Sequence, residues 1–374
     1  QDGKDLRLSF DAAWSRLAED ALRRAYAEAR DHPEPAWSEA VVAALREPRA
    51  AFALLDLRDG SVPVAVTLPT YTQEEWRQKY AQLVQQAGNP LRQRALGGSY
   101  RPGETPYPGS TYKPLLAAAA LLKDPNLAQR RIDCQGTWKP ARAGAQSVAL
   151  HCDDHRSHGS VNMEEALMRS CNVYFYSLAE EIGYERMYAL ATALGFGKWS
   201  GFEVGINAEV LLPPERAQDA WFVARSGIGQ VSVVASPLQM ARFYGWMATG
   251  QLWRPHLAAG TAAEYLLDSP NLADQQRAWL SQALRKVVED PRGTAHDSRW
   301  PLERFRVAGK TGTAQVEGNA PVHAWFTGWF PHDHPRYAFA VLGENAGLHG
   351  GDLAAVALYY FLEAAWKELM PAES

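Results

Sequence analysis

The sequence has little of several features that assign a protein to a class. Its formal net charge is only −4, so there is no electrostatic case for nucleic-acid binding. The 374 residues hold no run of about 18 apolar residues, which excludes a membrane-spanning helix from them. The three cysteines are an odd number, so a framework of disulfides alone would leave one thiol over.

The chain is long and hydrophobic enough to form a large core. With 374 residues, 47% of them hydrophobic, it predicts one large domain or two intimate ones. It carries no internal repeat or low-complexity tract. A signal peptide is also absent and the chain starts at Gln1, so we expect an excised extracytoplasmic fragment whose membrane anchor lies outside it.

Periodicity predicts strands near both ends of the chain and helices in the middle. Apolar runs flank the turn Asp59-Gly60, which predicts a hairpin. Residues 69–109 and 195–235 lack a long apolar period and are expected to be loops. Helices are expected at 9–30, 161–169, 172–194, 237–247, 274–288 and 352–367, and further strands at 306–316, 323–330 and 337–345.

This order favours a mixed α/β (α+β) fold with a central antiparallel sheet flanked by helices, beside a mostly helical lobe. We expect a single domain over 1–374. Residues 1–68 and 300–374 would form the sheet subdomain, and residues 110–295 the helical subdomain.

One stretch, Pro108-Gly-Ser-Thr-Tyr-Lys-Pro114, precedes a segment that is apolar on every side. A helix without a polar face is a buried helix, and a proline is tolerated in its first turn. The pattern therefore places Ser110 at the tip of a buried helix, with Lys113 one turn later on the same face. A serine needs a base to become a nucleophile, and a lysine with a lowered pKa can supply one.

Two further motifs follow in order, Ser170-Cys171-Asn172 and Lys310-Thr-Gly-Thr313. Taken singly, the first is a helix cap and the second an edge strand with a charged residue. Their ordered coincidence with Ser110-x-x-Lys113 is far more specific.

Each residue of the two motifs suits a role. Ser170 would relay a proton and Asn172 would hold a substrate amide. Lys310 would be a second cation that keeps one amine neutral. Gly312 would let a substrate approach the strand, and Thr311 and Thr313 would bind its terminal carboxylate. The backbone N–H groups of Ser110 and Thr313 are the candidate oxyanion donors.

With these motifs, the chain resembles the transpeptidase domain of class B penicillin-binding proteins over most of its length. The resemblance extends to Asn89–Tyr100, Ser226–Gln230 and Ser236–Ala241. Features such as Val287–Thr294, His323-Ala-Trp-Phe, Glu344-Asn345 and His349-Gly-Gly351 resemble the elongation-type branch, penicillin-binding protein 2. The chain departs from the pattern between Tyr100 and Pro108, where seven residues look like an insertion.

The resemblance implies a peptidoglycan D,D-transpeptidase. Ser110 would attack the penultimate D-Ala of a D-Ala-D-Ala stem peptide, release the last D-Ala, and pass the acyl group to an amine of a second stem. β-Lactam antibiotics would acylate the same serine, and no cofactor is needed for catalysis. The implied location is the periplasmic face of the inner membrane. The implied partner is a membrane glycosyltransferase, because the chain has no glycan-polymerising segment.

The three cysteines and one histidine form a second constellation, Cys134-x17-Cys152-x5-His158-x12-Cys171. Three thiolates and an imidazole can hold a structural zinc in a tetrahedron. Relatives of the elongation type resemble this, with mixed ligands at matching places. A Cys134–Cys152 disulfide and three free thiols are alternatives, and His151 and His155 are alternative ligands.

Other functions stay open at this stage. A serine β-lactamase shares the trio but needs a second base, for which Glu203 or Glu209 could be proposed. A D,D-carboxypeptidase differs only in using water as the acceptor. A non-catalytic penicillin-binding sensor or scaffold is the alternative from a different class.

Overall fold

The computed structural model describes residues 5–35, 37–97, 106–141, 148–198, 202–203, 210–217, 219–316 and 320–371. Its helices are α1 (Ala12–Asp31), α2 (Glu39–Arg46), α3 (Gln73–Gln85), α4 (Lys113–Lys123), α5 (Met163–Met168), α6 (Asn172–Ile182), α7 (Tyr184–Ala193), α8 (Ala220–Ser226), α9 (Pro237–Thr249), α10 (Asp274–Glu289) and α11 (Ala354–Leu369). Short 3-10 helices include η1 (Gly109–Tyr112) and η3 (Asp153–His155).

A five-stranded antiparallel sheet joins the two ends of the chain. Its order is β11-β12-β13-β1-β2, from β1 (Ala50–Asp56), β2 (Val64–Leu68), β11 (Ala308–Ala314), β12 (His323–Phe330) and β13 (Tyr337–Gly343). The predicted hairpin and the three predicted C-terminal strands are therefore confirmed, as is the central antiparallel sheet. Four small two-stranded pairs complete the strands: β3 (Ile132–Cys134) with β6 (Gly159–Val161), β4 (Thr137–Trp138) with β5 (Leu150–His151), β7 (Val210–Leu211) with β8 (Val233–Val234), and β9 (Leu252–Trp253) with β10 (Tyr265–Leu266).

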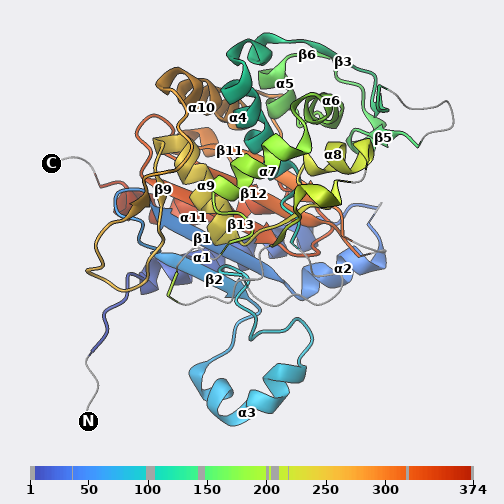
Figure 1. The fold of residues 1–374 in the computed structure, drawn as a ribbon. Coiled ribbons are helices and arrows are strands. Elements are labelled where there is room, and N and C mark those ends of the chain that lie inside the picture. The colour runs from blue at the N-terminus through green and yellow to red at the C-terminus, as the bar shows by residue number, and fades with distance from the viewer. Residues whose placement is uncertain are drawn as a thin grey trace.

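Helices cover both faces of the large sheet (Figure 1). Alternate residues of a strand point to opposite faces. On one face Leu55 contacts α9, where a Cβ on Gly245 would lie 2.6 Å from the Leu57 side chain. On the other face the Phe52 ring contacts the tilted ring of Phe361 of α11, which packs beside α1. The sheet is thus buried on both sides, and all residues of β1, β12 and β13 are buried.

Helices α4 to α8 and α10 form the lobe beside the sheet (Figure 1), and α2 packs against α1. Helix α4 is buried over Lys113–Leu121, as its apolar sequence predicts. Within the described residues, no helix combines the length and apolar character needed to cross a bilayer.

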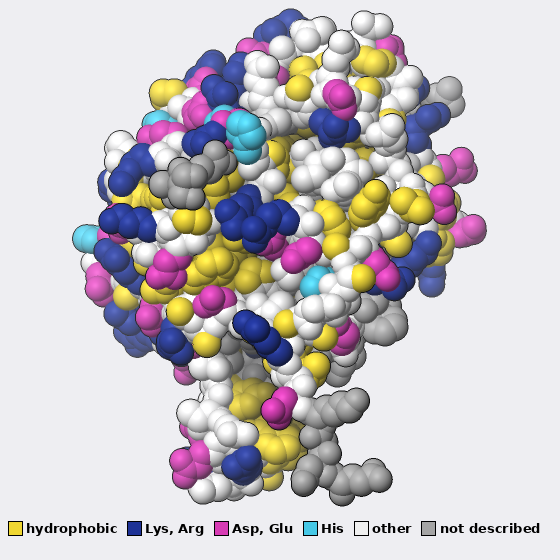
Figure 2. All heavy atoms as spheres, turned by 90° about the vertical axis from the view of Figure 1, so that its left-hand side faces the viewer, with side chains coloured by type: hydrophobic (Ala, Val, Ile, Leu, Met, Phe, Trp, Pro, Cys, Tyr) yellow, Lys and Arg dark blue, Asp and Glu magenta, His cyan; other side chains and the backbone are white. Residues whose placement is uncertain are grey.

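Three local expectations were wrong. The region 69–109 contains α3, which begins at a capping box between Thr72 and Glu75 but buries only Leu83. It stands away from the body, and its exposed Trp76 and Tyr80 lie on this projection (Figures 1 and 2). The region 195–235 contains the short helix α8. The helix expected over 172–194 breaks at Gly183, whose φ of 80° is incompatible with a continuing helix.

Candidate active site and thiol cluster

Ser110 lies on the 3-10 turn η1, directly before α4. The other residues of this turn, Gly109, Thr111 and Tyr112, are buried, whereas Ser110 is partly exposed. Gly109 has a φ of 55°, and its N–H donates to the carbonyl of Gly229 at 3.0 Å. The backbone therefore presents one hydroxyl at the tip of a buried helix.

The Lys113 amine connects the first two motifs. Its side chain is fully buried, and Nζ donates to Asn172 Oδ1 at 2.7 Å, to Ser170 O at 2.8 Å and to Ser170 Oγ at 3.1 Å. Burial lowers the pKa of Lys113 to about 8, against negative charge at Cys171, Cys152 and Asp153 that raises it. A sizeable fraction of this amine is neutral near physiological pH.

The second motif occupies the turn between α5 and α6. Ser170 N donates to Leu167 O and Cys171 N donates to Ala166 O, the two bonds of a Schellman turn at the end of α5. Ser170 takes the left-handed position of that turn with a φ of 56°, where glycine is the usual residue. Asn172 begins α6 and donates through Nδ2 to His151 O at 3.2 Å.

The third motif lies on β11, the edge strand of the sheet. Lys310 is fully buried, and burial together with the charge of Lys113 places its pKa well below the usual range. Thr311 is buried and shares a hydrogen bond of 2.5 Å with Thr294 Oγ1, whereas Thr313 is partly exposed. Thr313 is therefore the more accessible hydroxyl of the pair.

Strand β11 packs directly against the turn that carries Ser110. A Cβ on Gly109 would lie 3.1 Å from Thr313 O, and a Cβ on Gly312 would lie 2.9 Å from Pro108 O. The structure thus brings Ser110, Lys113, Ser170, Asn172 and the Lys310–Thr313 strand into one region. We expected the charge of Lys310 to keep one of the two amines neutral. Burial is the main cause of the lowered pKa of both amines, and the repulsion between the two charges lowers the pKa of Lys310.

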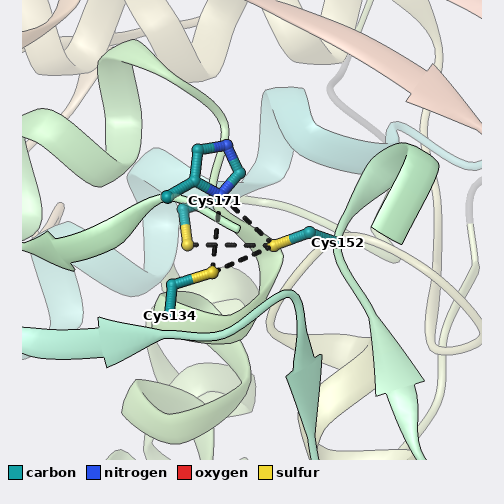
Figure 3. Close-up of side chains that lie close together, drawn as sticks. Cys134, Cys152 and Cys171 are labelled. Atoms are coloured by element: carbon teal, nitrogen blue, oxygen red, sulfur yellow. Dashed lines mark hydrogen bonds between the residues drawn. The ribbon is translucent and has the colours of Figure 1, made fainter. Parts of the chain in front are cut away.

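The thiol cluster includes Cys171 of the second motif, and Figure 3 shows the side chains of Cys134, Cys152 and Cys171 close together. Cys134 Sγ and Cys152 Sγ are 3.6 Å apart, Cys152 Sγ and Cys171 Sγ are 3.9 Å apart, and His158 Nδ1 is 3.5 Å from both Cys134 and Cys152. The four ligand atoms all lie within 4.8 Å of one another. The three cysteines are free, and the Cys134–Cys152 separation far exceeds a disulfide bond of about 2.05 Å.

These separations suit a tetrahedral ion. Zinc bonds of about 2.3 Å to sulfur and 2.0–2.1 Å to nitrogen give tetrahedron edges of about 3.8 Å between sulfurs and about 3.6 Å between sulfur and nitrogen. His151 and His155, the alternative ligands, are not in this group of ligand atoms. Their rings contact each other with centroids 4.1 Å apart, tilted by 51°.

The N-terminus of α6 supports the thiols electrostatically. Val173 N donates to Cys152 Sγ and Tyr174 N donates to Cys171 Sγ. The hydrogen bond from Cys171, assisted by His158, lowers the pKa of the Cys152 thiol below its ordinary value. The cluster therefore favours at least one thiolate, the form that binds metal.

Several residues around the motifs escaped the sequence reasoning. Tyr244 of α9 donates a hydrogen bond to Thr111 O at 2.8 Å and so connects α9 to η1. Thr294 Oγ1 shares a hydrogen bond with Thr311. His349 lies in the loop between β13 and α11, and its Nδ1 is 3.1 Å from Thr313 Oγ1, a partner that the sequence did not indicate. No spacing in the sequence could have indicated these contacts, because each joins segments brought together only by the fold.

The structure gives no support to Glu203 or Glu209 as the second base that a β-lactamase would need. Glu203 accepts hydrogen bonds from the backbone N–H groups of Leu257 and Ala258, so its carboxylate holds that loop. Glu209 lies outside the described residues, as do residues 101–105 of the apparent insertion and the end of the 89–100 segment.

Comparison with known proteins shows the family of the chain. The model of the penicillin binding protein transpeptidase domain matches residues 50–362. The chain is 30% identical over 353 residues to the peptidoglycan D,D-transpeptidase MrdA of Acinetobacter baumannii, covering 83% of this chain and 49% of that protein. It is 30% identical to the peptidoglycan D,D-transpeptidase PbpA of Mycolicibacterium smegmatis, covering 71% and 55%. The chain thus spans about half the length of these curated relatives.

Solved structures agree in fold. PBP2 of Pseudomonas aeruginosa, determined in complex with WCK 5153, superposes with a TM-score of 0.80 at 26% identity, covering 97% of this chain and 78% of that one. PBP2 of Helicobacter pylori, determined with MreC, gives a TM-score of 0.78 at 23% identity, covering 97% and 64%, and supports the fold alone. The chain belongs to the penicillin-binding protein transpeptidase domain family, and its curated relatives are of the MrdA and PbpA types.

Proposed function

We propose that this chain is a peptidoglycan D,D-transpeptidase that cross-links stem peptides through an acyl-enzyme on Ser110. One observation carries the proposal: a fully buried Lys113 amine with a pKa of about 8, hydrogen-bonded to Ser170 and Asn172 one turn from a partly exposed serine. The names of the MrdA and PbpA relatives state this activity for those proteins, and family membership supports it here.

The chemistry follows from the charges. Neutral Lys113 takes the Ser110 proton, and Ser110 Oγ attacks the carbonyl carbon of the penultimate D-Ala. The backbone N–H groups of Ser110 and Thr313 stabilise the oxyanion, and Ser170 relays a proton from Lys113 to the departing D-Ala amine. An amine of a second stem then takes the acyl group, with the same residues acting in reverse.

Mass spectrometry after incubation with a β-lactam tests this proposal. We expect one adduct per chain, mapped to Ser110, and no adduct on Ser110→Ala. Ser160→Ala is a matched control, because Ser160 is exposed on β6, outside the three motifs. Labelling that persists in Ser110→Ala, or absence of any adduct, would reject the acyl-enzyme.

The alternatives differ in the fate of that adduct. A transpeptidase and a carboxypeptidase both turn a β-lactam over slowly, whereas a β-lactamase releases it quickly. Supplying an acyl donor with and without an amine acceptor separates the first two, since only a transpeptidase forms a cross-linked product. A scaffold would instead leave cell-wall function intact in the Ser110→Ala strain.

We further propose that Cys134, Cys152, His158 and Cys171 hold a structural zinc. Four protein ligands leave no position for water, so the ion would brace the loop of η3 against the second motif and take no part in acylation. Zinc content after purification without chelator tests this: we expect one ion per chain, its loss in His158→Ala, and its retention in His155→Ala. Metal-free protein with one oxidised cysteine pair would reject the site.

The location and partners are proposals of the same kind. A catalytic domain that acts on peptidoglycan works on the extracytoplasmic side of the membrane, and there it would act with a membrane glycosyltransferase. Co-purification of the full-length protein with a glycosyltransferase from membranes, and its absence from cytosolic fractions, would support both.

A further inference from the structure

Three segments distant in the sequence meet at the accessible end of the third motif. Thr313 is on β11, His349 is in the loop between β13 and α11, and Asp153 begins η3. The Nδ1 atom of His349 lies 3.1 Å from Thr313 Oγ1 and 3.4 Å from Asp153 Oδ2. One ring nitrogen therefore joins the strand of the third motif to the loop that follows Cys152.

The His349 loop is held in place by close backbone packing. A Cβ on Gly350 would lie 2.0 Å from Trp325 O and 2.7 Å from Gly312 O, so only glycine fits beside the strand. A Cβ on Gly351 would lie 2.4 Å from Thr294 O. These contacts fix the backbone next to His349 and so place its ring against Thr313.

The partners of Nδ1 decide which tautomer the ring adopts. The Asp153 carboxylate lies 3.4 Å from Nδ1 as a charge contact, and a carboxylate beside a ring nitrogen favours the tautomer that carries its proton on that nitrogen. With Nδ1 protonated, the imidazole donates to Thr313 Oγ1 and occupies one of its lone pairs. The hydroxyl hydrogen of Thr313 is then free to turn away from the imidazole and donate to another acceptor.

We propose that His349 is a positioning residue that orients the Thr313 hydroxyl as a donor to the terminal carboxylate of the substrate. The inference rests on the proposed function and adds to it a determinant of carboxylate recognition. Thr311 cannot replace Thr313 in this task, because it is buried and its hydroxyl is shared with Thr294.

Paired donor substrates test the inference directly. One is an acyl-D-Ala thioester whose leaving group ends in a carboxylate, and the other is the same thioester ending in a carboxamide. For His349→Leu we expect the acylation efficiency to fall about tenfold with the carboxylate donor, through binding rather than the maximal rate, since the lost hydrogen bond serves a charged group. The carboxamide donor should change less than twofold.

Two further variants separate positioning from folding. His349→Asn places an amide N–H donor near the position of Nδ1, and should restore most of the preference for the carboxylate donor. His334→Leu is a matched control, because His334 forms a similar His–Asp pair with Asp333 at 3.6 Å on an exposed loop. It should leave both donors unchanged.

The outcomes distinguish this inference from the proposed function. Wild-type acylation of Ser110 with no loss of carboxylate preference in His349→Leu would overturn the role of His349 alone, as would an equal loss with both donors. Failure of the wild-type protein to be acylated at Ser110 would overturn the proposed function and this inference with it.

Discussion

If Lys113 is the base that activates Ser110, acylation should follow the protonation of that amine. Only the neutral amine can accept the serine proton, so the rate should rise with pH and level off above the pKa of Lys113. Burial lowers this pKa to about 8. About one tenth of the amine is then neutral at pH 7 and about one hundredth at pH 6.

The lowered pKa makes a large difference near neutrality. An amine at the ordinary value of about 10.5 would be neutral in only about three molecules per ten thousand at pH 7. Burial of Lys113 therefore raises the reactive fraction about 300-fold at that pH. The second-order acylation rate should increase nearly tenfold per pH unit from 6 to 7.5 and change little above 9.

Stopped-flow acylation with a fluorescent penicillin between pH 5.5 and 9.5 measures this profile. Lys113→Arg serves as the comparison, because a guanidinium keeps its proton over this range and should abolish the rise. A second comparison, the exposed Lys123→Arg at the other end of α4, should keep the wild-type profile. A flat wild-type profile from pH 6 to 9, or one that falls with pH, would refute the role of neutral Lys113.

Three further predictions concern the scaffold around the site. Glu344→Gln should lower the free energy of unfolding by about 3–5 kcal/mol in urea denaturation, because it leaves two buried guanidinium groups, Arg92 and Arg94, without their carboxylate. The exposed pair offers a control, and Glu264→Gln beside Arg254 should cost less than about 1 kcal/mol. Gly229→Ala should impair acylation by displacing η1, since its Cβ would lie 2.3 Å from Gly109 O. Gly183 also has a positive φ, but a Cβ there would meet nothing within 4 Å, so Gly183→Ala should leave the acylation rate intact. Ser170→Gly should slow acylation while raising the free energy of unfolding by up to about 1 kcal/mol. Ser170→Ala should slow acylation without raising the free energy of unfolding. Equal stability of the two variants would show that the turn is unstrained.

The sequence was a good guide to the sheet because its strands carry their own signals. Tyr337–Gly343 and His323–Phe330 are apolar runs between turn residues, and the Asp59-Gly60 pair marks the first hairpin. Helix α4 was predictable for the same reason, since a run without any polar face has to be buried.

Elements with weak burial were harder to predict. Helix α3 buries only Leu83, so its apolar period is short, and its capping box was its clearest signal. The break at Gly183 is a backbone turn between α6 and α7, and both helices have a helical pattern of apolar residues. Periodicity alone cannot locate such a turn, because the pattern on either side stays helical.

The site shows a similar division. The three motifs were visible because each is a short local pattern, and the structure places them together. Contacts such as Tyr244 with Thr111, or His349 with Thr313, join residues 133 and 36 positions apart and depend on packing alone. The main cause of the lowered Lys113 pKa is burial, which the apolar sequence of the following helix indicated, whereas the completeness of that burial is a property of the whole fold.

Ser170 shows how local strain and chemistry combine in this site. A Schellman turn places its left-handed residue at one fixed position, and glycine fills that position at the lowest cost. Here a serine occupies it, with a φ of 56°, and its hydroxyl lies 3.1 Å from Lys113 Nζ. The same turn brings the Ser170 carbonyl to 2.8 Å from that amine and places Cys171 as the N-cap of α6, so both contacts and the following helix constrain its geometry. Since a serine in this conformation costs of order 1 kcal/mol, its presence where glycine would be more stable is best explained by the hydroxyl it brings to Lys113.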